Sequence, residues 1–408
     1  MYGKLALRNL FRNRVRTFIT LLMIGSGSTA MVIAGGFIED TVHAIRESTI
    51  RDSLGHLRIS KKGFLEKKLF HPYDYLVSNP GELIKKVRAL PHVRVVGPRL
   101  DYCGLIGNGE LTLPFFMQAF DPALEDRMRN TTMILSGRFI TSDKPFDVMV
   151  GEGLAHSLNI HMGDGVVLLG NTQRGAMNAM DISVTGAFRT ILKDVDNSLI
   201  RAPITVAQKL LQVDGAQYLI VFLDQTENVN SVRDALLQLF KKENLDYEVQ
   251  VWRDIPGAEE ITNMENMYRS IYRVMKWVLF LFVILAIMNT MNMAVLERIG
   301  EIGTLMALGT ERHGILKLFL AEGVVLGLLG GLMGCIMGCV AAFVLSWIGI
   351  QMPKAPGSEM QWVAHIKLTP GILSGAFLMA FFTSLISSIL PALKASKLEV
   401  AEALRHNI

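Results

Sequence analysis

The hydrophobic pattern of the chain consists of four long apolar segments and one long polar stretch. The apolar segments cover residues 17–38, 271–296, 318–350 and 368–393. Each is long enough for a helix to cross hydrocarbon, which takes roughly 20 apolar residues. Residues 39–270, between the first two segments, are rich in charged and turn-forming residues. We therefore expect an α-helical membrane protein with four transmembrane helices and a large water-soluble domain between the first and second.

The polar stretch mixes helical and strand periods, which predicts a compact α+β domain. Residues 40–54 continue the first apolar helix, and residues 261–276 lead as a helix into the second. Pro114 places its strand at a sheet edge or a bend, because proline cannot donate to a strand ladder. Residues 170–181 lie between two strands and form either a long solvated hairpin or a loop that contacts a partner. The predicted strands are 57–60, 93–100, 111–120, 148–151, 166–169, 182–188, 218–223 and 247–251, and the predicted helices are 81–90, 152–158, 206–211 and 229–242.

Basic residues are concentrated in the short polar segments on one side of the predicted membrane. Residues 1–16, 297–317 and 394–408 together hold eleven Lys and Arg, whereas residues 351–367 on the other side hold two. Short loops rich in Lys and Arg stay in the cytoplasm. We therefore expect a multi-pass membrane protein with both termini cytoplasmic and the α+β domain extracytoplasmic.

The first apolar segment follows a basic stretch, as the core of a signal peptide does. Residues 17–38 are longer than the roughly 7–15 apolar residues of such a core, which favours a transmembrane helix. Residues 1–16 are interpreted as a cytoplasmic amphipathic segment on the membrane surface, with a simple topology anchor as the alternative.

Composition agrees with a membrane protein that carries a large soluble part, since 50% of residues are hydrophobic, 19% are charged and the mean hydropathy is +0.34. The net charge of +4 gives no reason to expect nucleic-acid binding. Gly3-Lys4 is the only Gly-Lys pair, so the sequence contains no phosphate-binding loop for ATP. Asp194 and Asp196 beside Lys193 are interpreted as a solvated loop. We expect no enzyme activity, cofactor or metal site in this chain.

The third apolar segment carries small residues at every fourth position, in two adjacent rows. Small residues let helices approach closely in lipid. We expect these rows to pack against another helix, either in this chain or in a second copy, with a glycine-tolerated helix bend as the alternative. One row is Gly323, Gly327, Gly331, Cys335 and Cys339, and the other is Gly330, Gly334, Gly338 and Ala342.

A short charged stretch punctuated by glycine, residues 297–309, lies between the second and third apolar segments. Together with residues 289–296 it resembles the cytoplasmic coupling segment of the FtsX/MacB/LolC family of ABC-transporter permeases, and we call residues 297–309 the coupling segment. In the external domain, residues 137–138, 150–155 and 163–166 resemble the MacB-type periplasmic domain. The resemblance continues, in the family's order and spacing, at residues 6–10, 16–17, 321–323, 330–331, 391–396 and 401–405.

This resemblance implies a permease subunit that passes motion from ATP hydrolysis to the outside of the membrane, a mechanism termed mechanotransmission. ATP would be bound by a separate cytoplasmic ABC ATPase, which the coupling segment would contact. The membrane would be a bacterial inner membrane, with the large domain in the periplasm. Residues 277–296 and the other three apolar segments hold no charge apart from Glu322 at an edge, so we expect no polar path through the bilayer. The residues expected to meet the ATPase are Glu297, Arg298, Glu301, Ile302, Gly303, Leu305, Met306 and Gly309.

Within the family, the lack of a fused ATPase in this sequence favours the lipoprotein-releasing LolC/LolE branch, which sorts lipoproteins toward the outer membrane. MacB-like export of drugs or peptides with a periplasmic adaptor, and FtsX-like regulation of cell-wall hydrolases, stay open. Readings outside the family are a solute transporter and a membrane-anchored periplasmic receptor or chaperone. The expected partners are the ATPase, a second permease copy or a paralogue, a periplasmic lipoprotein carrier or adaptor, and membrane lipids.

Overall fold

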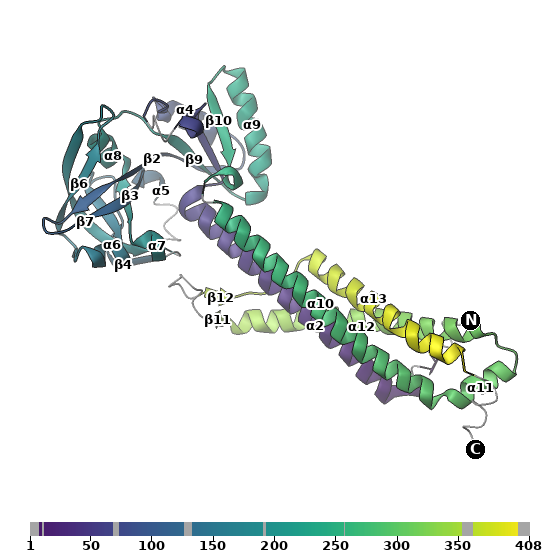
Figure 1. The fold of residues 1–408 in the computed structure, drawn as a ribbon. Helices are drawn as coiled ribbons and strands as arrows, with labels where there is room; N and C mark the ends of the chain where they lie inside the picture. The colour runs from purple at the N-terminus through teal and green to yellow at the C-terminus, as the bar shows by residue number, and fades with distance from the viewer. Residues whose placement is uncertain are drawn as a thin grey trace. The chain divides into compact units, whose positions relative to one another are not determined.

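The computed structural model of the chain describes residues 8–9, 12–67, 73–125, 133–190, 193–256, 258–352 and 362–398. The chain divides into two compact units, whose elements are labelled in Figure 1. The helical unit comprises residues 1–43, 264–352 and 362–408, and the sheet unit comprises residues 44–263 with 353–361. Most of the predicted amphipathic segment and of the predicted cytoplasmic tail, residues 1–16 and 394–408, lies outside the described residues.

Among the described residues, four helices are long and apolar enough to cross a membrane, as predicted. A short helix, α11 (Ile299–Ala307), lies between the second and third of them. Two short strands, β11 (Ile350–Met352) and β12 (Trp362–Ala364), form an antiparallel ribbon before the fourth. The four long helices are α2 (Arg14–Thr49), α10 (Ala258–Glu297), α12 (Arg312–Ile348) and α13 (Pro370–Ser396).

The ends of the long helices differ from the bounds of the apolar segments, because a helix ends where its backbone groups are capped. At the start of α13, the Thr369 hydroxyl accepts the backbone N–H of Ile372 at 3.3 Å, and Pro370 occupies the first turn. At the end of α12, Gly349 takes a left-handed φ of 67°. The expected helical extensions are present: α2 passes into a π-helical turn, η1 (Ile50–Leu54), and α10 begins at Ala258.

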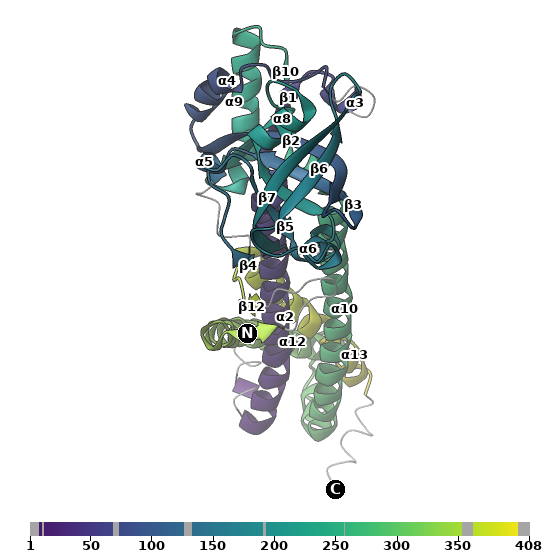
Figure 2. The ribbon, with the colours of Figure 1, turned by 90° about the vertical axis from the view of Figure 1, so that its left-hand side faces the viewer.

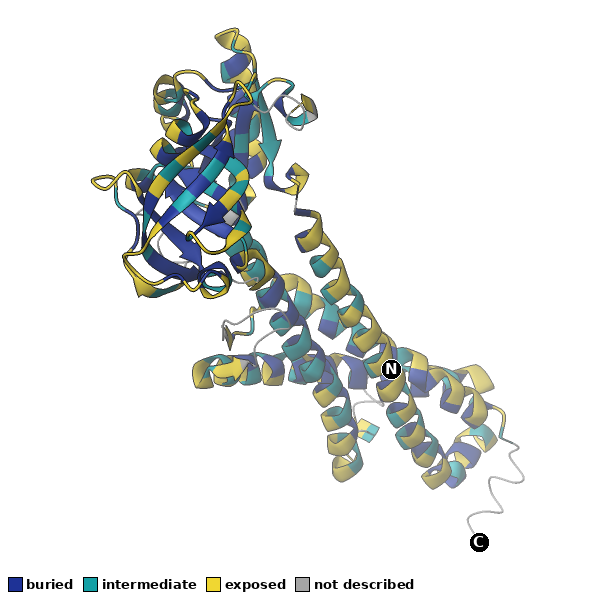
Figure 3. Cartoon of the chain, turned by 60° about the vertical axis from the view of Figure 1, so that its left-hand side comes forward, coloured by how far each residue is buried: buried dark blue, intermediate teal, exposed yellow. Residues whose placement is uncertain are grey.

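Large apolar side chains cover the outside of the helical unit. Trp277 and Phe282 on α10 are each 70% exposed, and Trp347 on α12 is 82% exposed. In water such exposure costs roughly 25 cal/mol per Å² of apolar surface, whereas lipid tails are as apolar as the side chains. Exposed positions recur along all the long helices in Figure 3. This surface is that of helices surrounded by lipid.

The sheet unit is built around one ten-stranded mixed sheet. Its strand order is β10-β1-β9-β2-β3-β8-β5-β7-β4, and β6 pairs with both β2 and β7, beside which it runs in Figure 2. The strands are β1 (Leu57–Lys61), β2 (Val93–Gly107), β3 (Thr112–Phe120), β4 (Met133–Gly137), β5 (Asp147–Gly151), β6 (Gly165–Asn171), β7 (Met177–Arg189), β8 (Leu199–Pro203), β9 (Tyr218–Leu223) and β10 (Tyr247–Val251).

Helices cover this sheet and close two separate hydrophobic cores. One core packs α8 on strands of the β2–β8 region and includes Leu100, Val150 and Leu210. The other packs α4 and α9 on β1 and β9 and includes Val221 and Leu236. The helices of this unit are α3 (Phe64–Lys67), α4 (Pro80–Arg88), α5 (Pro122–Glu125), α6 (Glu152–Ser157), α7 (Lys193–Asp196), α8 (Ile204–Leu211) and α9 (Val229–Lys242), with 3-10 turns η3 (Thr226–Asn228) and η4 (Trp252–Asp254). The predicted α+β domain is confirmed.

The structure refines two of the predicted strand features. Pro114 faces Leu105 of β2, and the parallel partner β8 joins β3 only from Phe116 onward. The proline therefore lies at a local edge of a strand that is otherwise paired on both sides. Residues 170–181 form a hairpin, which is the first of the two interpretations given above. The hairpin loop is short, because Asn171 already pairs with Met177. Most of that stretch is strand rather than loop.

The interpretation of Asp196 as part of a solvated loop is wrong. Its side chain is 2% exposed, and the carboxylate oxygens accept the backbone N–H of Thr190 at 3.0 and 3.1 Å. A buried carboxylate needs hydrogen-bond donors in place of water, and the Thr190 N–H is such a donor. Asp196 thus closes the turn between β7 and α7.

A buried histidine, His56, connects the end of the α2 extension to the sheet. Its Nδ1 accepts the backbone N–H of Leu223 at 3.2 Å, so Nε2 carries the proton and donates to the Thr226 hydroxyl at 3.1 Å. The Thr226 hydroxyl in turn donates to the Glu47 carboxylate. Burial lowers the pKa of His56 to about 4, which outweighs the opposing effects of Glu47, Asp224 and Glu227. The ring is therefore neutral at physiological pH.

Candidate functional site

The coupling segment forms one helix, α11, and a tight turn. α11 ends in a Schellman motif, in which the N–H of Thr310 reaches the carbonyl of Leu305 and the N–H of Gly309 reaches that of Met306, both at 3.0 Å. Gly309 has a φ of 94°, a conformation that costs side-chain-bearing residues about 1 kcal/mol or more. The glycine therefore fixes the turn between α11 and α12.

The inner face of α11 packs into the helical unit. Gly300, Ile302 and Gly303 are buried, and Ile302 is only 3% exposed. Ile302 belongs to a cluster with Val295, Ile315, Phe319, Ala392 and Ala395, which come from α10, α12 and α13. The expectation that Ile302 presents an apolar face to a partner is therefore wrong, because this side chain holds α11 to its own unit.

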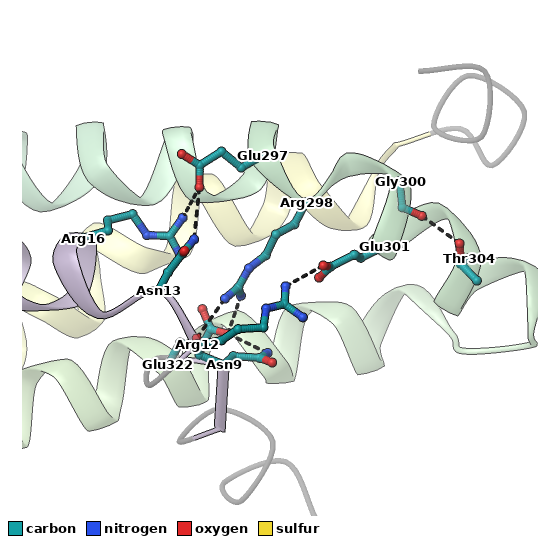
Figure 4. A network of polar contacts seen from close by, with 10 residues as sticks. All are labelled: Asn9, Arg12, Asn13, Arg16, Glu297, Arg298, Gly300, Glu301, Thr304 and Glu322. Carbon is teal, nitrogen blue, oxygen red and sulfur yellow. Dashed lines mark hydrogen bonds and ion pairs between the residues drawn. The ribbon is translucent and has the colours of Figure 1, made fainter. Parts of the chain in front are cut away.

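Arg298 also points inward, contrary to the prediction that it contacts a partner. Its Nη1 donates to Oε1 of Glu322 at 2.9 Å, and the two side chains are 6% and 2% exposed (Figure 4). The same carboxylate oxygen accepts from Nδ2 of Asn9 at 3.0 Å, and Nη2 of Arg298 donates to the Asn9 carbonyl at 3.2 Å. Glu322, expected as an isolated charge at a span edge, is thus paired with the charge of Arg298 and hydrogen-bonded by Asn9.

Two further ion pairs connect the N-terminal residues to the coupling segment. Arg12 lies 2.5 Å from a carboxylate oxygen of Glu301, and Arg16 lies 2.5 Å from Glu297, which Asn13 also contacts (Figure 4). The hydrogen bond to Glu301 raises the pKa of Arg12. Both carboxylates keep about half of their surface exposed, at 55% for Glu297 and 53% for Glu301.

These contacts were missed in the sequence because the basic residues 8–16 were interpreted only in relation to the membrane. A usable signal was present. The predicted topology places a basic stretch and an acid-bearing loop on the same cytoplasmic side, where opposite charges attract each other. The spacing of Asn9, Arg12 and Arg16 by three and four residues also matches one face of a helix.

The outer face of α11 is the part of the coupling segment that no described residue covers. Leu308 is 80% exposed and Leu305 is 40% exposed, with exposed Thr304 and Ala307 beside them. Met306 is half-buried. Of the residues predicted to meet a partner, those that remain accessible are Glu297, Glu301, Leu305, Met306 and Gly309, and Leu308 joins them. The face is apolar, and Glu301 lies at its rim.

The glycine rows of α12 face two different helices of the same unit. A methyl group added at Gly327 would come within 3.1 Å of Phe381 Cα and Ser384 Cβ on α13, and Gly323 and Gly331 also face α13. The second row faces α2: Gly330 lies against Ile24, Gly334 against Ser28 and Gly338 against Val32.

Hydrogen bonds to backbone carbonyls accompany both of these close approaches. Ser384 on α13 donates to the Gly323 carbonyl at 2.8 Å, and Thr29 on α2 donates to the Gly334 carbonyl at 3.1 Å. Both donors reach α12 where a glycine leaves its backbone accessible. α12 is thus held between α2 and α13.

Four membrane-spanning helices, a large sheet domain inserted after the first, and a short interhelical segment with an exposed apolar face define a transmembrane permease with an extracytoplasmic domain. Residues 17–239 match the MacB-like periplasmic core domain, which is more than half of the chain, and residues 273–400 match the FtsX-like permease C-terminal region. The chain belongs to the FtsX/MacB/LolC family of ABC transporter permeases.

Similar proteins come from archaea and bacteria. An uncharacterised ABC transporter permease of Methanocaldococcus jannaschii is 24% identical, over 98% of this chain and 96% of its own length. The lipoprotein-releasing system transmembrane protein LolC of Xylella fastidiosa is also 24% identical, over 97% and 95%. The periplasmic region of MacB from Actinobacillus actinomycetemcomitans is 15% identical, over 52% of this chain and 95% of that structure, with a TM-score of 0.36.

Proposed function

We propose that this permease carries motion from a separate cytoplasmic ABC ATPase to its extracytoplasmic domain, and that its cargo is lipoprotein destined for the outer membrane. Members of the family work with ABC ATPase subunits, and LolC is a lipoprotein-releasing protein by name. The observation that carries the proposal is the exposed apolar face of α11, because exposed apolar clusters mark contact surfaces. ATP binds to the partner subunit, and the chain itself needs no cofactor.

The transmission of motion from α11 to the long helices depends on how α11 is packed. Its inner face is packed against α10, α12 and α13, so a push on the outer face reaches those helices instead of only moving a loop. α10 is one unbroken helix from Ala258 to Glu297, and α2 is one from Arg14 to Thr49. Both helices begin or end in the sheet unit's part of the chain. Displacement at the cytoplasmic side therefore has a rigid route outward without a polar path through the bilayer.

The proposed arrangement is a multi-pass protein of the inner membrane with both termini in the cytoplasm, assembled with a second copy or a paralogue. The basic residues 8–16 and 312–317 support this orientation. The exposed apolar side chains of α10 and α12 are available to lipid and to a second permease.

Copurification tests the ATPase contact directly. The tagged chain is purified from its native host in mild detergent, and bound ABC ATPase is identified and quantified. Leu308→Ala should lower the retained ATPase about tenfold, because burying a leucine contributes roughly 1.5–3 kcal/mol and 1.4 kcal/mol is a factor of ten. Leu332→Ala is the matched control, since Leu332 is also exposed (55%) but lies on α12. Equal retention by both variants would reject the α11 face as the contact.

A second candidate is export of a drug or peptide through a periplasmic adaptor. It is supported by the match of residues 17–239 to a MacB-like periplasmic core. The two functions differ in the partner of the external domain. Crosslinking from a photoreactive residue at Asn171, in the β6–β7 hairpin, should capture a soluble lipoprotein carrier if the first candidate is right and a membrane-fusion protein if the second is.

A further inference from the structure

One carboxylate joins three segments that are far apart in the sequence. Glu322 lies near the start of α12, Arg298 follows the end of α10, and Asn9 belongs to the N-terminal residues. Arg298 Nη1 and Asn9 Nδ2 both donate to the same oxygen, Glu322 Oε1, at 2.9 and 3.0 Å. The junction adjoins the start of α11, because Arg298 is its N-cap and the Arg298 carbonyl accepts the N–H of Ile302 at 2.9 Å.

Stability alone does not account for this junction. A buried ion pair is often no more stabilising than apolar side chains of the same volume, because both ions lose their water. The donor set is also incomplete, since Arg298 Nε is buried and has no hydrogen-bond partner among the described residues. What the pair provides is a preference for one position of α11. If α11 shifts relative to α12, a charge is left buried and unpaired. The arrangement therefore favours one position of α11 over its alternatives.

The outer ion pairs extend the junction across the cytoplasmic surface of the unit. Arg12 pairs with Glu301 on α11, and Arg16 pairs with Glu297 at the end of α10. Exposed pairs such as these contribute little individually, about 0–1 kcal/mol each. Their geometry nevertheless places Arg12 beside the first turn of α11 and Arg16 beside the end of α10 (Figure 4).

We infer that Arg298 and Glu322 are positioning residues for coupling, and that Asn9, Arg12 and Arg16 form part of the coupling element. Asn9 and the Arg298–Glu322 pair hold α11, α12 and the N-terminal residues in register, so that these parts move together when the ATPase pushes on the outer face of α11. The coupling role rests on the proposed function, whereas the clamping of α11 does not.

The first measurement needs no ATPase. In a background without Cys103, Cys335 and Cys339, the thiol introduced by Ile302→Cys is treated with a membrane-impermeant maleimide in inside-out vesicles. It should stay protected in the parent and react at least tenfold faster after Glu322→Gln. Glu311→Gln, an exposed carboxylate outside the junction, is the control and should change nothing.

The second measurement uses the complex with the copurified ATPase, and compares ATP turnover with that of the ATPase alone. Arg298→Gln and Glu322→Gln should lower the stimulation of kcat by the permease at least fivefold. The retained ATPase should stay within twofold and the KM for ATP should not change, because Leu305 and Leu308 are untouched. The charge-exchanged pair Arg298→Glu with Glu322→Arg, and the conservative Glu322→Asp, should restore at least half of the lost stimulation.

Two outcomes of these measurements would overturn the inference. Protected thiol and full stimulation in both single variants would overturn the inference. Loss of bound ATPase in parallel with stimulation, without rescue, would show that the pair is merely structural and would also overturn it. If a single variant fails to insert, Asn9→Ala replaces it, with the same expected losses. If the unmodified chain retains no ATPase, the proposed function fails, and the thiol reactivity alone decides whether α11 is clamped.

Discussion

Replacing Gly327 by leucine should force α12 and α13 apart. A methyl group alone would lie 3.1 Å from Phe381 Cα and from Ser384 Cβ, and 3.2 Å from the Phe381 carbonyl oxygen. Two of these atoms belong to the backbone of α13, so no side-chain rotation relieves the contact. Leucine adds three further carbons to that methyl position, and the helices must separate along the whole crossing.

The magnitude follows from two losses. Overpacking of this kind costs about 1–3 kcal/mol. Separation also breaks the 2.8 Å hydrogen bond from Ser384 to the Gly323 carbonyl, one turn away, and such interhelical bonds average about 0.6 kcal/mol in a membrane protein. The sum is about 2–4 kcal/mol, or roughly a 30- to 1000-fold shift in the unfolding equilibrium at 1.4 kcal/mol per factor of ten.

Unfolding of the purified chain in mixed micelles, with increasing mole fraction of a denaturing detergent, measures this loss. Leu328→Ala is the control, because Leu328 is 44% exposed and lies on another face of α12. It should change the unfolding free energy by less than about 0.5 kcal/mol. Equal and small effects of Gly327→Leu and Leu328→Ala would refute the packing argument and favour a glycine that only permits a bend.

Three other predictions concern charge and topology. Glu301→Lys should leave membrane insertion intact but uncouple ATP hydrolysis from transport, because it turns the contact with Arg12 into repulsion; wild-type coupling in that variant would contradict the assignment. A thiol from Asn171→Cys should react with an impermeant reagent added outside and one from Glu311→Cys should not; the reverse pattern would invert the proposed topology. The His56 pKa of about 4 lies below the unfolded value of about 6.5, so the unfolded state binds the proton first and stability falls as pH drops through that window. Between pH 7.5 and 5 the loss should be about 2 kcal/mol in thermal unfolding, and it should disappear in His56→Gln.

The sequence predicts those parts of the fold that depend on local pattern. The unbroken apolar run of β9 predicts a buried strand, and all six of its residues are buried. The strand β8 was missed because it is short and contains Arg201 and Pro203. Arg201 is nevertheless 5% exposed, with its guanidinium 5.0 Å from the ring centroid of Phe188. The burial of this arginine depends on an aromatic partner from another strand, and the local sequence pattern does not identify that partner.

The same distinction applies to the candidate site. The position of the coupling segment follows from its location between two apolar segments, and the periodicity of the small residues indicates close packing of α12. The inward direction of Arg298 does not follow from its neighbours in the sequence, Glu297 and Ile299. It depends on Glu322 and on Asn9, whose proximity arises only when the helices assemble.

The two glycine rows of α12 also constrain how this protein can vary. At each crossing, the quantity limited by the structure is the combined side-chain volume of two residues on different helices, such as Gly338 with Val32 or Gly334 with Ser28. A larger residue on α12 is then acceptable where its neighbour on α2 becomes smaller by the same volume. Substitutions at these crossings should therefore be tolerated as size-exchanged pairs, and a glycine of α12 taken alone is a misleading guide to which positions matter.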